Sequence, residues 1–192
     1  MTPFWIRQVK GNAGHSRTAV RCGPRYHAGM FAKPDLHVAP VTPDRIGAVR
    51  ALRVAPQQEP FVGDTGFNLD DALRDGNSEA MAILVGATPV GFYRLDFAPT
   101  IVARRSIGEA GLGLRAFFLD VGWQGRGLGT RAVQACCEDV QARHPGRRLL
   151  ALNVNCRNVT AINAYRKAGF VDTGELYLGG SAGPQHLMVR RL

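Results

Sequence analysis

The sequence predicts an α/β fold, with a central mixed and mostly antiparallel sheet flanked by about four helices. Two observations carry this prediction. In the first half of the chain, two apolar runs flank Gly86-Ala87-Thr88-Pro89, which is typical of an antiparallel hairpin. In the second half, apolar runs alternate with helical patterns, as in strands joined by helices. A chain of 192 residues is long enough to bury the core of such a domain.

The first elements are expected between residues 36 and 76. Residues 36–41 alternate between apolar and polar side chains, as in a short strand. Thr42 and Pro43 then favour a helix start, because Thr is a good cap and Pro suits the first helical position. A second short helix is predicted to take Asn68 as its cap and to end at Gly76.

The remaining elements follow from apolar runs and helical periodicity. Strands are predicted over residues 81–85, 90–97, 112–121, 149–154, 170–178 and 186–189. A glycine-rich turn follows residue 121 and leads into an amphipathic helix, and a last helix begins at Asn158 and ends at Gly169. The predicted order is βααβββαβαββ, without an internal repeat.

Residues 1–33 differ from the rest of the chain in charge. They contain no acid, and their basic residues are Arg7, Lys10, Arg17, Arg21, Arg25 and Lys33. The formal net charge of +9 is therefore reduced to +3 over residues 34–192. We interpret residues 1–33 as a basic N-terminal arm or tail and residues 34–192 as a single domain. Two interpretations of the arm stay open: translation naturally starts at Met30, or the arm docks on a partner.

The compartment is predicted from what the sequence lacks. No apolar run approaches the roughly 20 residues that cross a bilayer, and the N-terminus has no secretory pattern. The cysteines show no metal-ligand spacing; they are Cys22, Cys136, Cys137 and Cys156. We therefore expect a cytoplasmic protein with no membrane partner and no metal.

The segment from Gln124 to Thr130 has the chemistry of an anion site. It lies between a predicted strand and a predicted helix, and glycines occupy positions 125, 127 and 129. The free N–H groups and the dipole at a helix N-terminus attract anions, and glycines let the backbone approach a phosphate closely. Arg126 adds a guanidinium donor. Taken alone, this pattern also fits a glycine-rich turn that binds nothing.

Two motifs together resemble the GNAT acetyltransferase superfamily. Residues 124–129 look like its Q/R-x-x-G-x-G/A signature, and residues 155–170 are similar to its N-x-x-A-x-x-x-Y-x-K-x-G-F segment. The motifs occur in the family's order and on the expected elements. The resemblance implies the GNAT-type fold and an N-acetyltransferase that uses acetyl-CoA as its cosubstrate.

The resemblance also implies which residues contact the cofactor. The strand over residues 117–121 would splay from its neighbour and bond the pantetheine arm through the backbone of Leu119 and Val121. The pyrophosphate would lie on the backbone of Gln124, Gly125, Arg126, Gly127, Leu128, Gly129 and Thr130. Asn158 would cap its helix and contact the cofactor, and Asn163 is a further candidate.

The catalytic candidates follow from the chemistry of amine attack on a thioester. Direct attack forms a tetrahedral oxyanion, which a backbone N–H near Leu119 can stabilise, and then expels a thiolate, which the Tyr165 phenol can protonate. The alternative for Tyr165 is packing between helix and sheet. Glu109 and Asp120 are the candidate bases, although either could be a solvated carboxylate.

The acceptor is predicted from a weaker resemblance. Residues 53–62 look like the interhelical segment of spermine/spermidine acetyltransferase-like members, and Glu59 and Asp64 could attract a polyamine. Alternatively, both carboxylates face water. The leading function is acetyl transfer to a primary amine of a small molecule, polyamine-like by weak preference.

Other functions stay open. One is acetylation of a protein N-terminus or lysine; two of another class are a nucleic-acid-binding module using the basic arm and a coenzyme A sensor without catalysis. We expect no nucleic-acid partner, because the paired motifs would then be unexplained. The sequence leaves a homodimer open.

Overall fold

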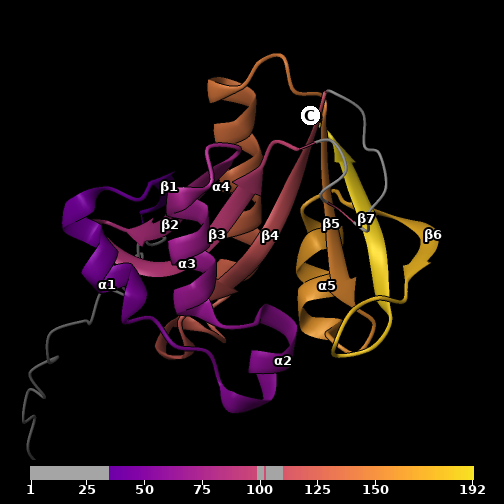
Figure 1. The fold of residues 1–192 in the computed structure, drawn as a ribbon, viewed down its shortest axis with the longest axis horizontal. Helices are drawn as coiled ribbons and strands as arrows, with labels where there is room; N and C mark the ends of the chain where they lie inside the picture. Colours follow the sequence, from indigo (N-terminus) through magenta and orange to yellow (C-terminus); the bar gives the residue numbers. More distant parts are fainter. Residues whose placement is uncertain (1–34, 99–101, 103–109) are drawn as a thin grey trace, which may run out of the picture. The chain divides into compact units, whose positions relative to one another are not determined.

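A seven-stranded sheet runs through the protein in the order β1-β2-β3-β4-β5-β7-β6 (Figure 1). The computed structural model describes residues 35–98, 102 and 110–192. The predicted basic arm and Glu109 lie outside these described residues. Neighbouring strands are antiparallel except β4 and β5, which are parallel. The strands are β1 (Leu36–Pro40), β2 (Ser78–Val85), β3 (Thr88–Asp96), β4 (Gly111–Leu119), β5 (Leu149–Asn155), β6 (Val171–Tyr177) and β7 (Gln185–Arg191).

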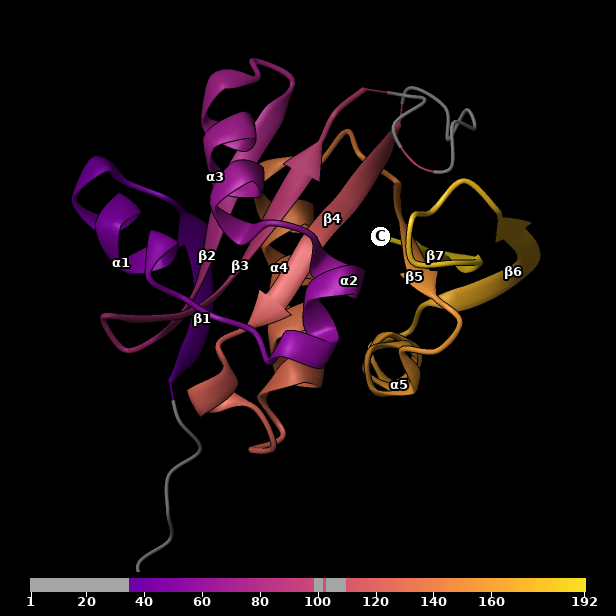
Figure 2. The same cartoon turned by 60° about the horizontal axis from the view of Figure 1, so that its bottom comes forward.

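Helices cover both faces of the sheet (Figure 2). They are α1 (Ile46–Arg50), α2 (Glu59–Val62), α3 (Thr65–Arg74), α4 (Leu128–Arg143) and α5 (Val159–Lys167). On one face, Val49 of α1 and Leu69 of α3 pack against Phe92 of β3. On the other face, α4 and α5 pack against side chains that include Met81 and Leu112. Because side chains alternate between two covered faces, strands such as β2 and β3 are buried along most of their length, in agreement with the apolar runs that predicted them.

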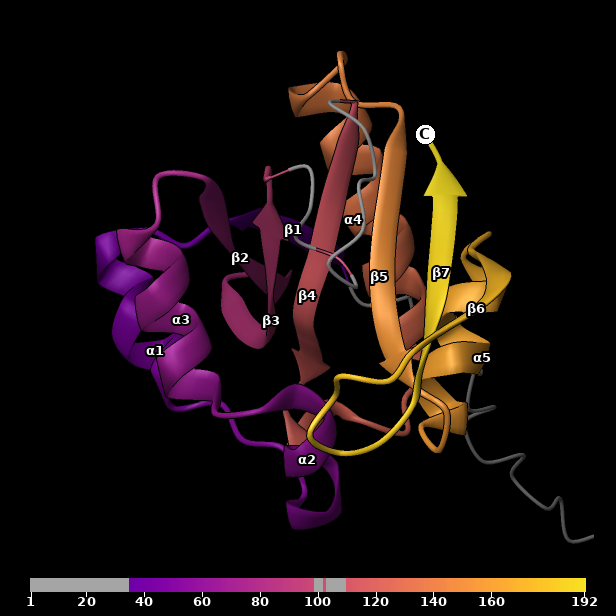
Figure 3. The same ribbon diagram turned by 45° about the vertical axis from the view of Figure 1, so that its right-hand side comes forward.

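Strands β4 and β5 pair over a short distance and then separate (Figure 3). Their paired residues are Gly111 with Leu149, Leu112 with Leu150 and Gly113 with Ala151. Beyond them β4 carries a bulge, because the register on β3 shifts by one residue between Arg94 and Phe92. Ala116 lies in this bulge with φ 48°, a left-handed conformation that is rare outside glycine. Since a bulge bends and twists a strand, it directs the end of β4 away from β5.

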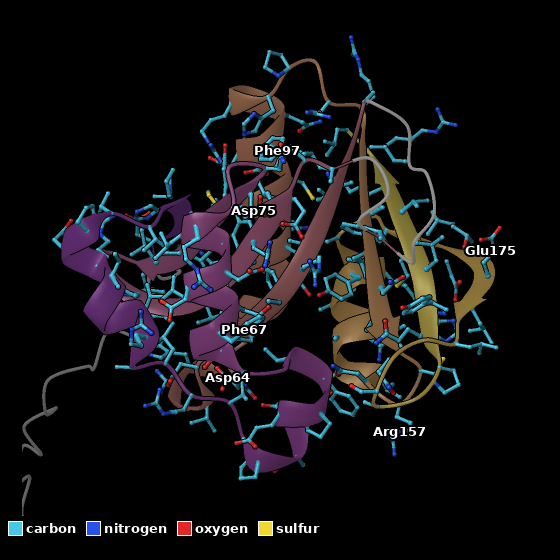
Figure 4. All side chains as sticks on the ribbon, viewed as in Figure 1. Asp64, Phe67, Asp75, Phe97, Arg157 and Glu175 are labelled. Atoms are coloured by element: carbon cyan, nitrogen blue, oxygen red, sulfur yellow. The ribbon has the colours of Figure 1, made fainter. Side chains whose placement is uncertain are left out.

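The start of α3 corrects one prediction. The helix begins at Thr65, and its cap is Asp64, whose Oδ1 accepts the Phe67 N–H at 2.7 Å (Figure 4). Asn68, the predicted cap, lies inside the first turn and donates from Nδ2 to the Asp64 carbonyl at 2.8 Å. Gly63 ends the preceding helix with φ 76° and frees Asp64 to start the next one.

Two further boundaries differ from the prediction. Strand β4 ends at Leu119, and Asp120 caps a 3-10 turn, Val121–Trp123, instead of continuing the strand. The segment before α3, expected to link two helices, contains a 3-10 turn at Pro56–Gln58 and the helix α2. In the described part of the chain, no helix is both long and apolar enough to cross a membrane.

Candidate active site

The separation of β4 from β5 creates two adjoining cavities of about 500 Å³ each. One, here called the loop cavity, is lined by the glycine loop, the start of α4 and one side of α5. The other, here called the amide cavity, is lined by side chains that include Asn68, Asn153, Asn155 and Gln185. The residues that line both cavities are Val62, Phe117, Asn158, Ala161 and Tyr165.

The glycine loop presents backbone donors to the loop cavity. Gly125 and Gly127 have φ of 72° and 70°, a conformation that L-residues with a Cβ rarely adopt. Gly127 is the N-cap of α4, and no side chain caps that helix. The first-turn N–H groups of a 16-residue helix are therefore available to an anion. Predicted loop residues that line this cavity are Gln124, Gly125, Gly127, Leu128, Gly129 and Thr130.

Arg126 takes a different position from the rest of the loop. Its guanidinium lies 5.0 Å from the ring centroid of Trp123, a cation–π contact, and it is not among the residues that line either cavity. Trp123 itself lines the loop cavity. In this structure Arg126 therefore contributes positive charge near the loop without facing its interior.

The end of β4 directs one backbone unit into the separation. The Asp120 N–H donates to the Val90 carbonyl on β3 at 2.8 Å. Because an antiparallel pair alternates between bonded and non-bonded residues, Leu119 presents its N–H and carbonyl away from β3. The Gln124 Nε2 donates to this Leu119 carbonyl at 2.8 Å. The Val121 N–H donates instead to the Arg53 carbonyl at 2.8 Å, so it is already engaged.

Gln124 joins the glycine loop to the turn before α2. Its Oε1 accepts from Gln58 Nε2 at 2.9 Å, and its Nε2 donates to Gln58 Oε1 at 3.0 Å. Gln58 Oε1 also accepts the Ala55 N–H at 3.1 Å. The side chain of Gln124 thus holds neighbouring segments in place, whereas the prediction for Gln124 concerned its backbone.

Tyr165 lies at the junction of the two cavities. Its side chain is buried, with the ring 6.1 Å from that of Phe117 and 5.6 Å from that of Phe170, measured between centroids. Burial raises the pKa of the Tyr165 phenol well above its usual value, so the hydroxyl stays protonated at neutral pH. Asn158 positions the helix that carries Tyr165, because its Oδ1 accepts the Ala161 N–H at 3.2 Å.

Among the other predicted residues, Asn163 lines the loop cavity. Asp120 lines neither cavity; its Oδ2 accepts the Arg53 N–H and its Oδ1 accepts the Gly122 N–H, both at 2.9 Å. These bonds give Asp120 a structural role in the turn. Among the described residues, neither cavity is lined by an Asp, Glu or His side chain.

Glu59 and Asp64 line neither of the two cavities that meet at Tyr165. They line a separate cavity of about 560 Å³ with Arg50 and Arg53. The Asp64 carboxylate is also engaged as the cap of α3 (Figure 4). The interhelical segment contributes Phe61 and Val62 to the amide cavity instead.

Several polar residues of the amide cavity were not predicted from the sequence. Asn153 and Asn155 lie two apart on β5, so both side chains leave the same face of a strand that is otherwise apolar. Two amides on one face of an apolar strand could have indicated a polar cavity at that face. Arg115 also lines the cavity, and its NH1 donates to Asp96 Oδ2 at 2.9 Å. Nothing in the local sequence marks Arg115, because the cavity depends on the separation of two distant strands.

The chain matches a known protein family over the segment that contains the glycine loop and Tyr165. Residues 46–170, more than half of the chain, match the Acetyltransferase (GNAT) family. The chain belongs to the GNAT family. As a GNAT protein it is an acetyl-CoA-dependent acyltransferase, which confirms the prediction made from its two motifs.

Curated and solved GNAT relatives cover most of the chain. The spermine/spermidine N(1)-acetyltransferase of Bacillus subtilis (strain 168) is 26% identical over 157 residues, which are 82% of this chain and 99% of that protein. The structure of aminoglycoside acetyltransferase AAC(6')-Ib with coenzyme A has a TM-score of 0.64 at 19% identity, covering 81% of this chain and 94% of that one. Spermidine N-acetyltransferase from Vibrio cholerae, with coenzyme A and spermine, gives a TM-score of 0.60 at 13% identity and covers 81% and 95%.

The loop cavity fits the acyl donor of a GNAT enzyme. The uncapped first turn of α4 suits a pyrophosphate, since its N–H groups have no side-chain partner. The backbone of Leu119 faces the separation, where an extended pantetheine chain could bond it as a strand would. Among the described residues, no group of His, Cys, Asp and Glu side chains is placed to hold a metal ion.

Proposed function

We propose that this protein transfers the acetyl group of acetyl-CoA to a primary amine of a small molecule. One observation carries the proposal: Tyr165 lines both cavities at the separation of β4 from β5. A thioester that reaches this junction from the loop cavity meets an amine that enters from the amide cavity. A volume of about 500 Å³ is within the range of small-molecule sites.

The proposed reaction is direct attack. The amine nitrogen attacks the thioester carbonyl, an oxyanion forms, and the carbon–sulfur bond then breaks. In this proposal the Leu119 N–H, which points away from β3, stabilises the oxyanion. The protonated phenol of Tyr165 can give its proton to the departing thiolate, a role that contributes about 10²- to 10⁴-fold in rate.

The base in this proposal is water. An alkyl amine is largely protonated at neutral pH and must lose a proton before it attacks. Among the described residues, no carboxylate or imidazole lines either cavity, and Asp120 is engaged in its turn. The ammonium loses one proton to solvent before the attack. The nitrogen loses a second proton to solvent as the amide forms, and the Tyr165 phenolate regains from solvent the proton that it gave to the thiolate.

A polyamine is the second candidate acceptor. The names of the Bacillus subtilis relatives favour it, because those proteins are described as acting on spermine or spermidine. The described lining of the amide cavity does not favour it, because that lining contains no carboxylate to neutralise a second ammonium group.

The proposal is tested by measuring thiol release from acetyl-CoA across a panel of amines. The panel should contain spermidine, an aminoglycoside, a peptide with a free N-terminus, pentane-1,5-diamine and 6-aminohexanoate. We expect release with at least one small-molecule amine, together with its N-acetyl product. Coenzyme A binding without release for any amine would favour a sensor, and release with the peptide alone would favour a protein acetyltransferase.

A further inference from the structure

We propose that the amide cavity selects a primary amine that also carries a carboxylate, and that Arg115 holds this carboxylate. The inference rests on the proposed function and narrows its acceptor.

The first observation is the charge of the cavity. Among the described residues that line it, Arg115 is the one with a formal charge, and the polar remainder consists of amides and phenols. A polyamine would bring at least one ammonium group beyond the one that reacts. That ammonium would face the guanidinium of Arg115, and no carboxylate of the described lining could pair with it, because Asp96, which bonds Arg115, lies outside the lining. The anionic group of an acceptor would instead be attracted to the guanidinium of Arg115.

The second observation is how Arg115 is held. Its side chain is 43% exposed, and its NH1 bonds to Asp96, which is 2% exposed. Asp96 in turn accepts from Arg94 at 2.9 Å and from the Ser78 hydroxyl. A guanidinium has five N–H donors, and the described contacts of Arg115 use one of them. One guanidinium nitrogen of Arg115 is therefore held by Asp96, and the remaining N–H donors can bind a carboxylate.

The acidic neighbours of Arg115 do not supply a site for a cation. Asp71 accepts from Arg94 NH1 at 2.6 Å, and Asp75 accepts from the Asn77 N–H at 2.9 Å and from Arg94 NH2 at 3.5 Å. Neither aspartate lines the amide cavity, and neither does Asp96. Asp71 and Asp75 are committed to Arg94 and to the turn before β2, and Asp96 bonds both Arg94 and Arg115 from outside the cavity lining.

The third observation is an unpartnered atom in the cavity wall. The Asn153 Oδ1 is buried and has no hydrogen-bond partner among the described residues. Buried polar atoms usually have partners, and an orphaned one costs free energy. Asn155 differs, because its Nδ2 donates to the Ala182 carbonyl and its Oδ1 accepts the Arg157 N–H, both at 2.9 Å. Asn153 can therefore accept an N–H from a bound acceptor while Arg115 holds its carboxylate.

The test uses two acceptors that differ in one group. Pentane-1,5-diamine and 6-aminohexanoate both carry a primary amine on a five-carbon chain, and they end in an ammonium and a carboxylate respectively. We expect the wild-type enzyme to prefer 6-aminohexanoate in kcat/KM. The Arg115→Gln variant should lower this preference by about 10- to 100-fold, the range for a charge-assisted bond. Arg115→Lys should recover part of it.

The preference is a ratio measured on one enzyme, so a partly unfolded variant does not distort it. Arg148→Gln is the matched control, because it removes one exposed positive charge that lies outside the described cavity lining. Its preference should equal that of the wild type. A wild-type preference for the diamine, turnover confined to amines without an acidic group, or an unchanged ratio in Arg115→Gln would each overturn the carboxylate proposal alone. Absence of thiol release with every amine would overturn the proposed function as well.

Discussion

The side-chain amides of Gln58 and Gln124 bond to each other in both directions, at 2.9 and 3.0 Å. Gln124 also donates to the Leu119 carbonyl at the end of β4. One pair of amides therefore ties three segments together: the turn before α2, the glycine loop and the end of β4. We infer that this pair positions the loop for the cofactor.

Removing either amide should weaken cofactor binding more than it slows the chemical step. We expect Gln58→Ala and Gln124→Ala each to raise the KM for acetyl-CoA by about 3- to 10-fold, because each change removes the two hydrogen bonds between the amides and one to the backbone. The double variant should be less than additive, with a coupling energy of at least about 0.5 kcal/mol. Gln57→Ala, at an exposed neighbouring position, is the control. Strict additivity would show that the pair does not act as a unit.

Tyr165→Phe should lower kcat by about 10²- to 10⁴-fold, because the variant loses the proton donor for the thiolate. The KM for acetyl-CoA should change by less than about 3-fold, since the ring and its packing remain. Tyr177→Phe is the matched control; Tyr177 lines the amide cavity but not the loop cavity. Steady-state kinetics of both variants measure the changes in kcat and in the KM for acetyl-CoA. An unchanged kcat for Tyr165→Phe would remove this residue from the mechanism.

The pH dependence of kcat/KM should reflect the titration of the acceptor amine and not that of Tyr165. Burial raises the pKa of Tyr165 above its usual value, so the phenol remains a proton donor as the pH rises. We expect kcat/KM for an alkyl amine to increase tenfold per pH unit and to level off near the pKa of the amine, about 10.4. A fall in kcat/KM with a midpoint below about pH 9 would contradict a protonated phenol with a raised pKa.

Gly91→Ala should destabilise the protein where β3 pairs with the end of β4. A Cβ at this position would lie 2.5 Å from the Phe118 carbonyl oxygen and 2.9 Å from the Leu119 side chain. We expect a loss of about 1–3 kcal/mol in the free energy of unfolding, together with weaker acetyl-CoA binding, because β4 must shift. At Gly47 of α1 no atom lies within 4 Å of the added Cβ, so Gly47→Ala should leave stability equal or slightly higher. Denaturant unfolding of both variants tests this, and equal losses would refute it.

Features set by local chemistry were predictable from the sequence. The glycine loop and the Asn158 cap lie where the pattern placed them, because each depends on residues within one turn of the chain. The start of α3 was misplaced, since Asp64 and Asn68 are both good caps and the left-handed Gly63 decides between them. Helix α2, four residues long with Pro60 in its first turn, was too short to give a periodic signal.

Features that need two distant segments were not predictable in the same way. Arg115 enters the amide cavity because a bulge turns β4 away from β5, and no single stretch of sequence encodes that separation. Glu59 and Asp64 were assigned to the acceptor site by the resemblance of their segment and by their charge, but they line a different cavity. The acceptor site was therefore harder to predict than the donor site.

A crystal structure of the protein with coenzyme A bound tests the central claim most directly. We predict that pyrophosphate oxygens accept hydrogen bonds from backbone N–H groups of residues 125–130, and that the thiol sulfur lies within about 3–4 Å of the Tyr165 hydroxyl. Coenzyme A bound outside the separation of β4 from β5, or a sulfur beyond the reach of Tyr165 even through one water, would contradict the account.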